Sequence, residues 1–196
     1  MAGTVSDSAQ SYFQSMTEIF GRLEMSLIDR YAELLFGAWR ERRRVLVFGN
    51  GGSAFTASHH VLDYVKTAEV PKQPRLLALS MVDNMGITTA VGNDSSYEET
   101  LVYPLESYAS AGDLAVAISC SGNSPNVVRA CRWAREHDLT VVALTGFAGG
   151  EVGPIADLHI NIPSENYGII EDIQMSIGHI AAQMLQQRVA REVNPA

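Results

Sequence analysis

Two histidines and two carboxylates lie on two distant segments, with types and spacings suited to binding a metal ion or moving a proton. His59 and Asp63 stand four residues apart, so in a helix they share one face. Glu171 and His179 stand eight residues apart, about two helical turns, and can lean toward one side of a second helix. Such side chains are typical ligands of tetrahedral Zn²⁺ and also serve acid–base catalysis without metal. Each alone would equally suit a surface or capping position, and spacing does not establish that the pairs meet.

Two turns rich in glycine and serine have the composition of a phosphate site. Residues 49–53 (GNGGS) follow the apolar run 45–48, and residues 119–124 (SCSGNS) follow the apolar run 114–118. At the carboxyl ends of parallel strands, such turns lead into helix N-termini whose free N–H groups attract anions. Neither turn has the P-loop or the dinucleotide pattern, and one such turn alone is commonly just a turn. Two at matching strand ends predict a phosphate cradle.

The elements that must position these residues follow from hydrophobic periodicity. Residues 7–44 place apolar side chains mostly at three- and four-residue steps, which predicts helices with a break near 24–26. From residue 45, short apolar runs alternate with helical segments. The predicted strands are 45–48, 76–79, 114–119, 140–145 and 158–162. The predicted helices lie near 53–67, 84–92, 97–109, 123–137 and 168–191. Alternation of this kind predicts an α/β protein, a three-layer αβα sandwich around a five-stranded parallel sheet.

Length and composition predict one domain over residues 1–196, with helices in 7–44 and an α/β core in 45–191. No repeat, proline-rich linker or low-complexity tract suggests a second domain. The tail from Arg188 is expected to fray.

Charge and cysteine content limit the classes of partner and compartment. A net charge of −8 argues against a nucleic-acid or anionic-membrane surface, but not against a small anion held by backbone N–H groups. The two cysteines, Cys120 and Cys131, are expected to be reduced thiols. With no signal-peptide pattern and no apolar run long enough to cross a bilayer, we expect a cytoplasmic protein without a membrane partner.

These motifs together resemble the SIS (sugar isomerase) domain family, and in order and spacing its sedoheptulose 7-phosphate isomerases. The resemblance starts near Val45 and runs to the end of the chain. Its marks are GNGGS-(5)-H-(3)-acid, VGND, ISxSGNSxNVVRA, VVALTG-(2)-GG and the acid eight residues before a late histidine. The resemblance implies a flavodoxin-like core and a homotetramer with active sites between subunits. The wide apolar stripe of residues 7–44 would suit packing on its own domain or an interface with another subunit, and assembly would explain its width.

The resemblance also implies an activity and a role for each motif. Sedoheptulose 7-phosphate would be converted to D-glycero-D-manno-heptose 7-phosphate through a metal-assisted enediol, at the start of nucleotide-activated heptose synthesis. The acid–base pair would be Asp63 and His179. One Zn²⁺ per site would have the ligands His59, Asp63, Glu171 and His179. The phosphate and sugar would be held by residues of the two turns and of VGND: Asn50, Gly51, Gly52, Ser53, Asp94, Ser119, Cys120, Ser121 and Ser124.

Three positions depart from the family pattern. Asp63 is one methylene shorter than the family's glutamate, and Glu171 is charged where the family has a neutral amide. Glu171 is therefore a second candidate for the catalytic base. Gly168 replaces an aspartate, which removes one polar contact to the sugar. Lys66, one turn beyond Asp63, either supplies a new contact or is simply solvated.

Two alternatives follow from these departures. The first alternative is an isomerase of another heptose or octose phosphate. The second is a non-catalytic SIS-domain protein that binds a sugar phosphate or a replication initiator. The retained set of histidines and carboxylates favours an enzyme, because the binding branch typically lacks it.

Overall fold

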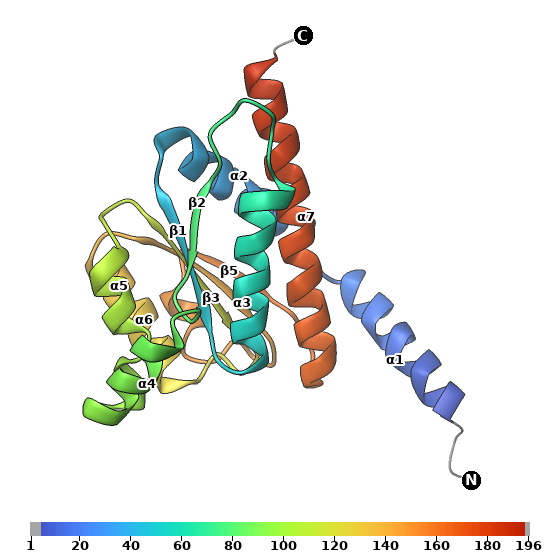
Figure 1. The fold of residues 1–196 in the computed structure, drawn as a ribbon. Coiled ribbons are helices and arrows are strands. Elements are labelled where there is room, and N and C mark those ends of the chain that lie inside the picture. Colours follow the sequence, from blue (N-terminus) through green and yellow to red (C-terminus); the bar gives the residue numbers. More distant parts are fainter. Residues whose placement is uncertain (1–4, 195–196) are drawn as a thin grey trace.

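The computed structural model describes residues 5–194, with side chains from residue 8 onward, and contains the predicted parallel sheet (Figure 1). Its five strands are all parallel and lie in the order β2-β1-β3-β4-β5. The bounds are β1 (Arg44–Gly49), β2 (Leu77–Ser80), β3 (Leu114–Ser119), β4 (Thr140–Thr145) and β5 (Leu158–Asn161). The predicted α/β class and strand number are confirmed.

Helices cover both faces of this sheet. Two N-terminal helices, α1 (Val5–Phe20) and α2 (Met25–Glu41), precede β1. The other helices are α3 (Gly52–Leu62), α4 (Met85–Asp94), α5 (Val102–Tyr108), α6 (Pro125–Glu136) and α7 (Tyr167–Val193). Single turns of other helix types span Asp63–Thr67 (η1, π), Tyr97–Glu99 (η2, 3₁₀) and Gly153–Ile155 (η3, 3₁₀). Among the described residues, no helix is long and apolar enough to span a membrane.

Each face of the sheet has its own hydrophobic core. Along β1, Val45 and Val47 pack with α2, α3 and α7, whereas Leu46 and Phe48 pack with α5 and α6. This alternation follows from the two-residue period of a strand. It leaves α3 and α7 side by side on one face, while α1 extends away from the body (Figure 1).

Several element boundaries differ from the predictions. The N-terminal helices separate at residues 21–24 rather than at 24–26. The helix predicted for 97–109 is a 3₁₀ turn followed by α5, because a helix starting at 97 would place Pro104 in its interior. The expectation that the tail frays from Arg188 is wrong, since α7 continues to Val193 and the Arg188 guanidinium bonds to Asp29 and Glu33 of α2.

A buried contact between His60 and Gly178 fixes how closely α3 and α7 approach. A Cβ atom at Gly178 would lie 2.2 Å from the imidazole of His60, so only glycine fits there. His60 Nε2–H donates to the backbone carbonyl of Gln174 in α7 (3.1 Å). His60 Nδ1 accepts from the Tyr64 hydroxyl (3.3 Å), which in turn accepts from the hydroxyl of Tyr31 in α2 (2.6 Å). Burial lowers the pKa of His60 to about 4, so the ring is neutral and each hydrogen bond has a defined direction.

Candidate active site

Three of the four predicted metal ligands lie together between α3 and α7. One ligand atom from each of His59, Asp63 and His179 lies within 4.8 Å of the other two. His179 Nδ1–H donates to Asp63 Oδ2 over 2.6 Å, and His59 Nε2 lies 3.7 Å from the same oxygen. The Asp63 side chain is 6% exposed, while those of His59 and His179 are 39% and 45% exposed. A buried carboxylate between two accessible imidazoles can bind a cation or relay a proton.

The backbone of η1 gives Asp63 its orientation. The Ala68 N–H bonds to the Asp63 carbonyl over 2.8 Å, an i→i+5 bond that widens the helix by one residue. Within this turn, the Thr67 hydroxyl donates to Asp63 Oδ1 over 2.8 Å. The two carboxylate oxygens of Asp63 therefore have different partners.

Glu171, the fourth predicted ligand, lies outside the group formed by His59, Asp63 and His179. A Cβ atom at Gly52 would be 2.3 Å from Glu171 Oε1, which places the carboxylate over the first turn of α3. Glu171 Oε1 is also 4.0 Å from the sulfur of Cys120. Eight residues of an ideal helix give a rotation of about 800°, or roughly 80° beyond two full turns, and a rise of about 12 Å. Glu171 and His179 therefore face different parts of α3.

The two turns predicted to form a phosphate cradle lie at the carboxyl ends of β1 and β3. The strands are neighbours in the sheet, with Gly49 opposite Ile118. A Cβ atom at Gly49 would lie 2.6 Å from the carbonyl oxygen of Ile118, so a side chain there would push the loops apart. Gly51 has φ +54° and precedes α3, whose first N–H groups lack intrahelical partners. Such a helix N-terminus attracts anions, and the Glu171 carboxylate lies over this same turn.

The second loop orders two of its hydroxyls by bonds to its own backbone. Ser119 Oγ accepts from the Gly122 N–H (3.2 Å), and Ser121 Oγ accepts from the Asn123 N–H (3.2 Å). Ser124 is the N-cap of α6, and its side chain makes no capping hydrogen bond. Ser53 and Ser119 are both buried. The hydroxyls that the sequence placed in a cradle thus lie on two adjacent loops beside two helix N-termini.

An amide pair that the sequence did not reveal joins the loop after β1 to the first turn of α6. Asn50 Nδ2 donates to Asn126 Oδ1 over 2.7 Å, and Asn126 Nδ2 donates to Asn50 Oδ1 over 2.9 Å. The Tyr97 hydroxyl also donates to Asn50 Oδ1 (3.1 Å). Asn50, predicted to line the sugar pocket, therefore also holds the first loop against α6. No spacing rule signals this pair, because its members lie 76 residues apart.

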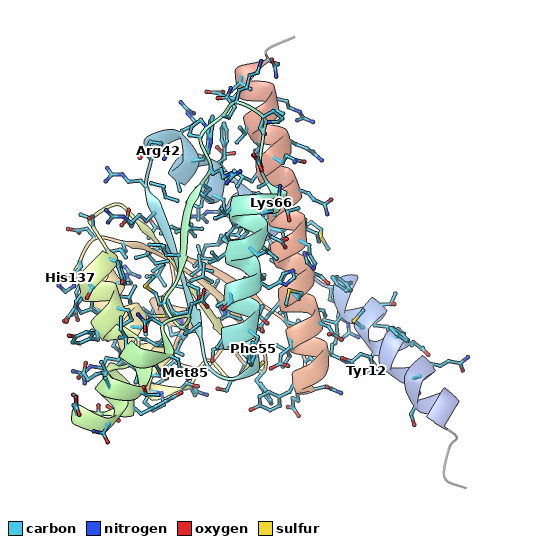
Figure 2. All side chains as sticks on the ribbon, in the orientation of Figure 1. Tyr12, Arg42, Phe55, Lys66, Met85 and His137 are labelled. Carbon is cyan, nitrogen blue, oxygen red and sulfur yellow. The ribbon has the colours of Figure 1, made fainter. Side chains whose placement is uncertain are left out.

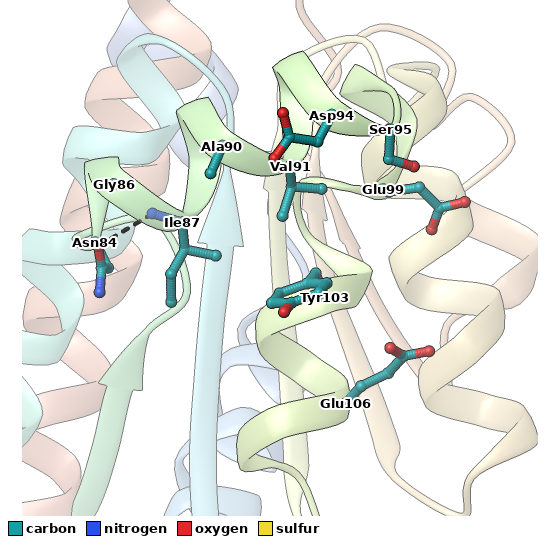
Figure 3. Close-up of a pocket in the computed structure, with 10 residues that line it drawn as sticks. All are labelled: Asn84, Gly86, Ile87, Ala90, Val91, Asp94, Ser95, Glu99, Tyr103 and Glu106. Atoms are coloured by element: carbon teal, nitrogen blue, oxygen red, sulfur yellow. Dashed lines mark hydrogen bonds between the residues drawn. The ribbon is translucent and has the colours of Figure 1, made fainter.

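Cys120 and Asp94 have distinct surroundings. Burial, with a smaller effect of the Glu171 carboxylate, raises the pKa of the Cys120 thiol to about 11, so the thiol is neutral at ordinary pH. Asp94 accepts from the side-chain amide of Asn93 (2.8 Å) and lines a groove of about 580 Å³ between α4 and α5 (Figure 3). Asn84 begins α4 at the other end of this groove by accepting from the Ile87 N–H.

The two positions with open interpretations from the sequence lie at opposite ends of the α3–α7 pair. Phe55 lies near the N-terminal end of α3, and Lys66 lies just beyond the C-terminal end of this helix (Figure 2). The Lys66 side chain is exposed, and its Nζ lies 3.3 Å from Glu69 Oε2. Gly168 faces the hydroxyl of Tyr12 in α1, and a Cβ atom added at Gly168 would lie 2.9 Å from that hydroxyl oxygen. The same hydroxyl donates a hydrogen bond to the Asp172 carboxylate. Within this chain Lys66 therefore pairs with Glu69, and Tyr12 occupies the space beside Gly168.

The cradle and the group of His59, Asp63 and His179 lie along one helix. His59 follows Gly52 by seven residues, a rise of about 10 Å at 1.5 Å per residue. An extended sugar phosphate is of comparable length. A phosphate at the N-terminus of α3 would therefore place the far end of the sugar near the two histidines and Asp63.

Comparison with known proteins finds a SIS domain over residues 11–146. A phosphoheptose isomerase of Geobacter sp. (strain M21) is 34% identical over 180 residues, covering 92% of this chain and 93% of the relative. That of Bordetella avium (strain 197N) is 40% identical over 150 residues, covering 75% of this chain and 76% of the relative. The structure of a phosphoheptose isomerase from Francisella tularensis matches with a TM-score of 0.87 at 26% identity, covering 94% of this chain and all (100%) of that one.

Proposed function

The chain belongs to the SIS domain family and, within it, to the phosphoheptose isomerases, which are aldose–ketose isomerases; from this premise we propose that its substrate is sedoheptulose 7-phosphate. The product is D-glycero-D-manno-heptose 7-phosphate. The observation that carries the proposal is the distance along α3 from its N-terminus to His59 and Asp63. It separates an anion site from an acid–base group by about the length of the substrate.

The phosphate binds the loops after β1 and β3 through backbone N–H groups and serine hydroxyls. The residues of this cradle are Gly51, Gly52, Ser53, Ser119, Cys120, Ser121 and Ser124, and Asn50 lines the sugar pocket. A contact of Asp94 with the sugar stays a prediction, because Asp94 lines the groove between α4 and α5. Binding of the phosphate at this remote end aligns the reacting carbons with the catalytic groups. This alignment lowers the entropic part of the activation free energy.

Asp63 and His179 exchange the protons of the isomerisation. One takes the proton from C1 of the ketose and returns it to C2, and the other moves the proton between the two oxygens, through an enediol. The 2.6 Å hydrogen bond between them supports this division, because a proton already lies between the two groups. The alternative in which Glu171 acts as the base or as a ligand stays a prediction. Because its carboxylate lies beside Gly52 and outside the group of three, the proposal assigns the base role to Asp63 or His179.

The group of His59, Asp63 and His179 fits Zn²⁺. Two imidazole nitrogens and one carboxylate oxygen within 4.8 Å of one another match a catalytic zinc site, which has three protein ligands and one open position. When bound there, the ion supplies Lewis-acid polarisation of the substrate carbonyl.

Assembly as a homotetramer with active sites between subunits, in the cytoplasm, completes the proposal. The apolar side chains of α1 support a role for this helix in assembly: Phe13 is 63% exposed on a helix that extends away from the body (Figure 1). Both cysteines are free and buried, as suits a reducing compartment.

The direct test incubates the purified protein with sedoheptulose 7-phosphate and follows the aldose product, with and without chelator. Conversion that chelator removes and Zn²⁺ restores supports the metal-assisted isomerase. Conversion of another heptulose or octulose phosphate in preference to this one would replace the substrate. No conversion of any ketose phosphate would overturn the proposal.

A further inference from the structure

The carboxylate of Asp63 has one oxygen in the group of three and one oxygen outside it. Oδ2 faces His179 and His59, while Oδ1 accepts the hydroxyl hydrogen of Thr67 over 2.8 Å. An ionised carboxylate offers only acceptors, so the Thr67 hydroxyl must be the donor in this bond. Thr67 thus contacts Asp63 through the oxygen that is not paired with the two histidines.

The backbone of Thr67 is held by the same helix that carries His179. Gln186 of α7 donates its side-chain amide to the carbonyls of Thr67 (3.0 Å) and Glu69 (3.1 Å). Gln186 follows His179 by seven residues, so about two turns of α7 lie between the two points where α7 contacts η1. These contacts keep η1 in register with α7 and leave the Thr67 hydroxyl in place beside Asp63.

A carboxylate on a short side chain needs such a partner. The terminal torsion of aspartate is broad and roughly two-fold, so the carboxylate plane can rotate. Without a second partner, neither carboxylate oxygen would be held toward the histidines. We propose that Thr67 is a positioning residue that holds Oδ1 of Asp63 and thereby keeps Oδ2 directed at His179 and His59. This role rests on the proposed function for its catalytic consequence, but its effect on Asp63 is independent of it.

The test compares Thr67→Val with Thr67→Ser. Valine keeps the branched shape and loses the donor, whereas serine keeps the hydroxyl. Thr89→Val is the matched control, because Thr89 is an exposed helical threonine whose hydroxyl donates to the Met85 carbonyl, away from the group of three. The variants are measured for kcat and KM, for Zn²⁺ affinity by chelator competition, and for the ¹⁵N and ¹H signals of the His179 imidazole in metal-free protein.

We expect Thr67→Val to lower kcat and Zn²⁺ affinity by about tenfold or more, with KM within about twofold. The His179 signals should shift, while Thr67→Ser and Thr89→Val resemble the wild type. The inference is overturned if Thr67→Val leaves all three readouts unchanged, or if Thr67→Ser loses as much as Thr67→Val. A wild type without any isomerase activity would overturn the proposed function, while Zn²⁺ affinity and the His179 signals would still decide the role of Thr67.

Discussion

Asp63 and His179 are joined by a 2.6 Å hydrogen bond across two helices, although 116 residues separate them in the chain. The bond is one of several contacts that set the register of α3 against α7. Gly52 lies opposite Glu171, His60 opposite Gln174 and Gly178, and Thr67 opposite Gln186. The helices run parallel, because each follows a parallel strand on the same face of the sheet. The geometry of the proposed site therefore depends on how these helices pack.

Replacement of either member of the Asp63–His179 pair should abolish most of the activity. Asp63→Asn and His179→Gln keep side chains of similar size but remove the proton-transfer groups, so we expect kcat to fall by about 10²- to 10⁴-fold. Circular dichroism should show folded proteins. Asp138→Asn is the control, because Asp138 is exposed at φ +61°, a conformation that asparagine also accepts. Near wild-type turnover in both site variants would refute the assignment.

Glu171→Gln should improve substrate binding and leave metal binding nearly unchanged. The carboxylate lies over the first turn of α3, where its negative charge would repel the phosphate of the proposed cradle. Removing a like charge near the phosphate is worth about 1 kcal/mol, so KM should fall about fivefold. Glu165→Gln, an exposed acid just before α7, should change KM little. A tenfold loss of Zn²⁺ affinity in Glu171→Gln would instead identify Glu171 as a metal ligand.

Periodicity and strand-end chemistry predicted the fold and the two loops from the sequence. Five apolar runs and the glycine-rich turns are local signals, and in a parallel sheet they place 49–53 and 119–124 at the same edge. That the two strands are neighbours comes from the strand order of the folded sheet. The spacing of His59 and Asp63 also predicted a shared face, because four residues make about one helical turn.

The remaining features depend on tertiary packing. Nothing local in DYVKT specifies the extra residue of a π turn, so the contact of Thr67 with Asp63 had no signal. The offset of Glu171 from His179 arises from helical rotation over eight residues, which a simple count of turns conceals. The Asn50–Asn126 pair needs the relative position of the loop after β1 and helix α6, which only the folded sheet provides.

Gly178→Ala should destabilise the protein although alanine favours helices. The added methyl would lie 2.2 Å from the buried ring of His60, and neither helix can move away without breaking the bond of His60 to Gln174. Overpacking of this kind costs about 1–3 kcal/mol. Gly37→Ala in α2 is the control, because nothing lies within 4 Å of its added Cβ, and it should stabilise by up to about 1 kcal/mol. Urea denaturation measures both, and equal stability of the two variants would contradict the close contact.

Acid should weaken the fold through His60. Its folded pKa of about 4 lies below the ordinary value of 6.5, so between these values the unfolded chain binds a proton that the folded protein does not. The contribution of neutral, buried His60 to the free energy of unfolding is therefore fully present above pH 6.5. It is lost as the pH falls toward 4, by about 3 kcal/mol in all. Burial lowers the pKa of His60, the hydrogen bond to the Gln174 backbone and the Asp63 charge oppose this shift, and His59 and His179 add to it.

The test for His60 is the pH dependence of urea denaturation in His60→Gln. Glutamine retains an N–H donor for the Gln174 carbonyl but does not titrate. The free energy of unfolding of His60→Gln should therefore fall less steeply between pH 6.5 and 4 than that of the wild type. His137→Gln, an exposed histidine at the end of α6, should retain the wild-type slope. Both variants keep Asp63, His59 and His179. The difference between their pH slopes therefore leaves out the titration of these three groups. Identical slopes in His60→Gln and the wild type would mean that His60 does not carry the acid sensitivity.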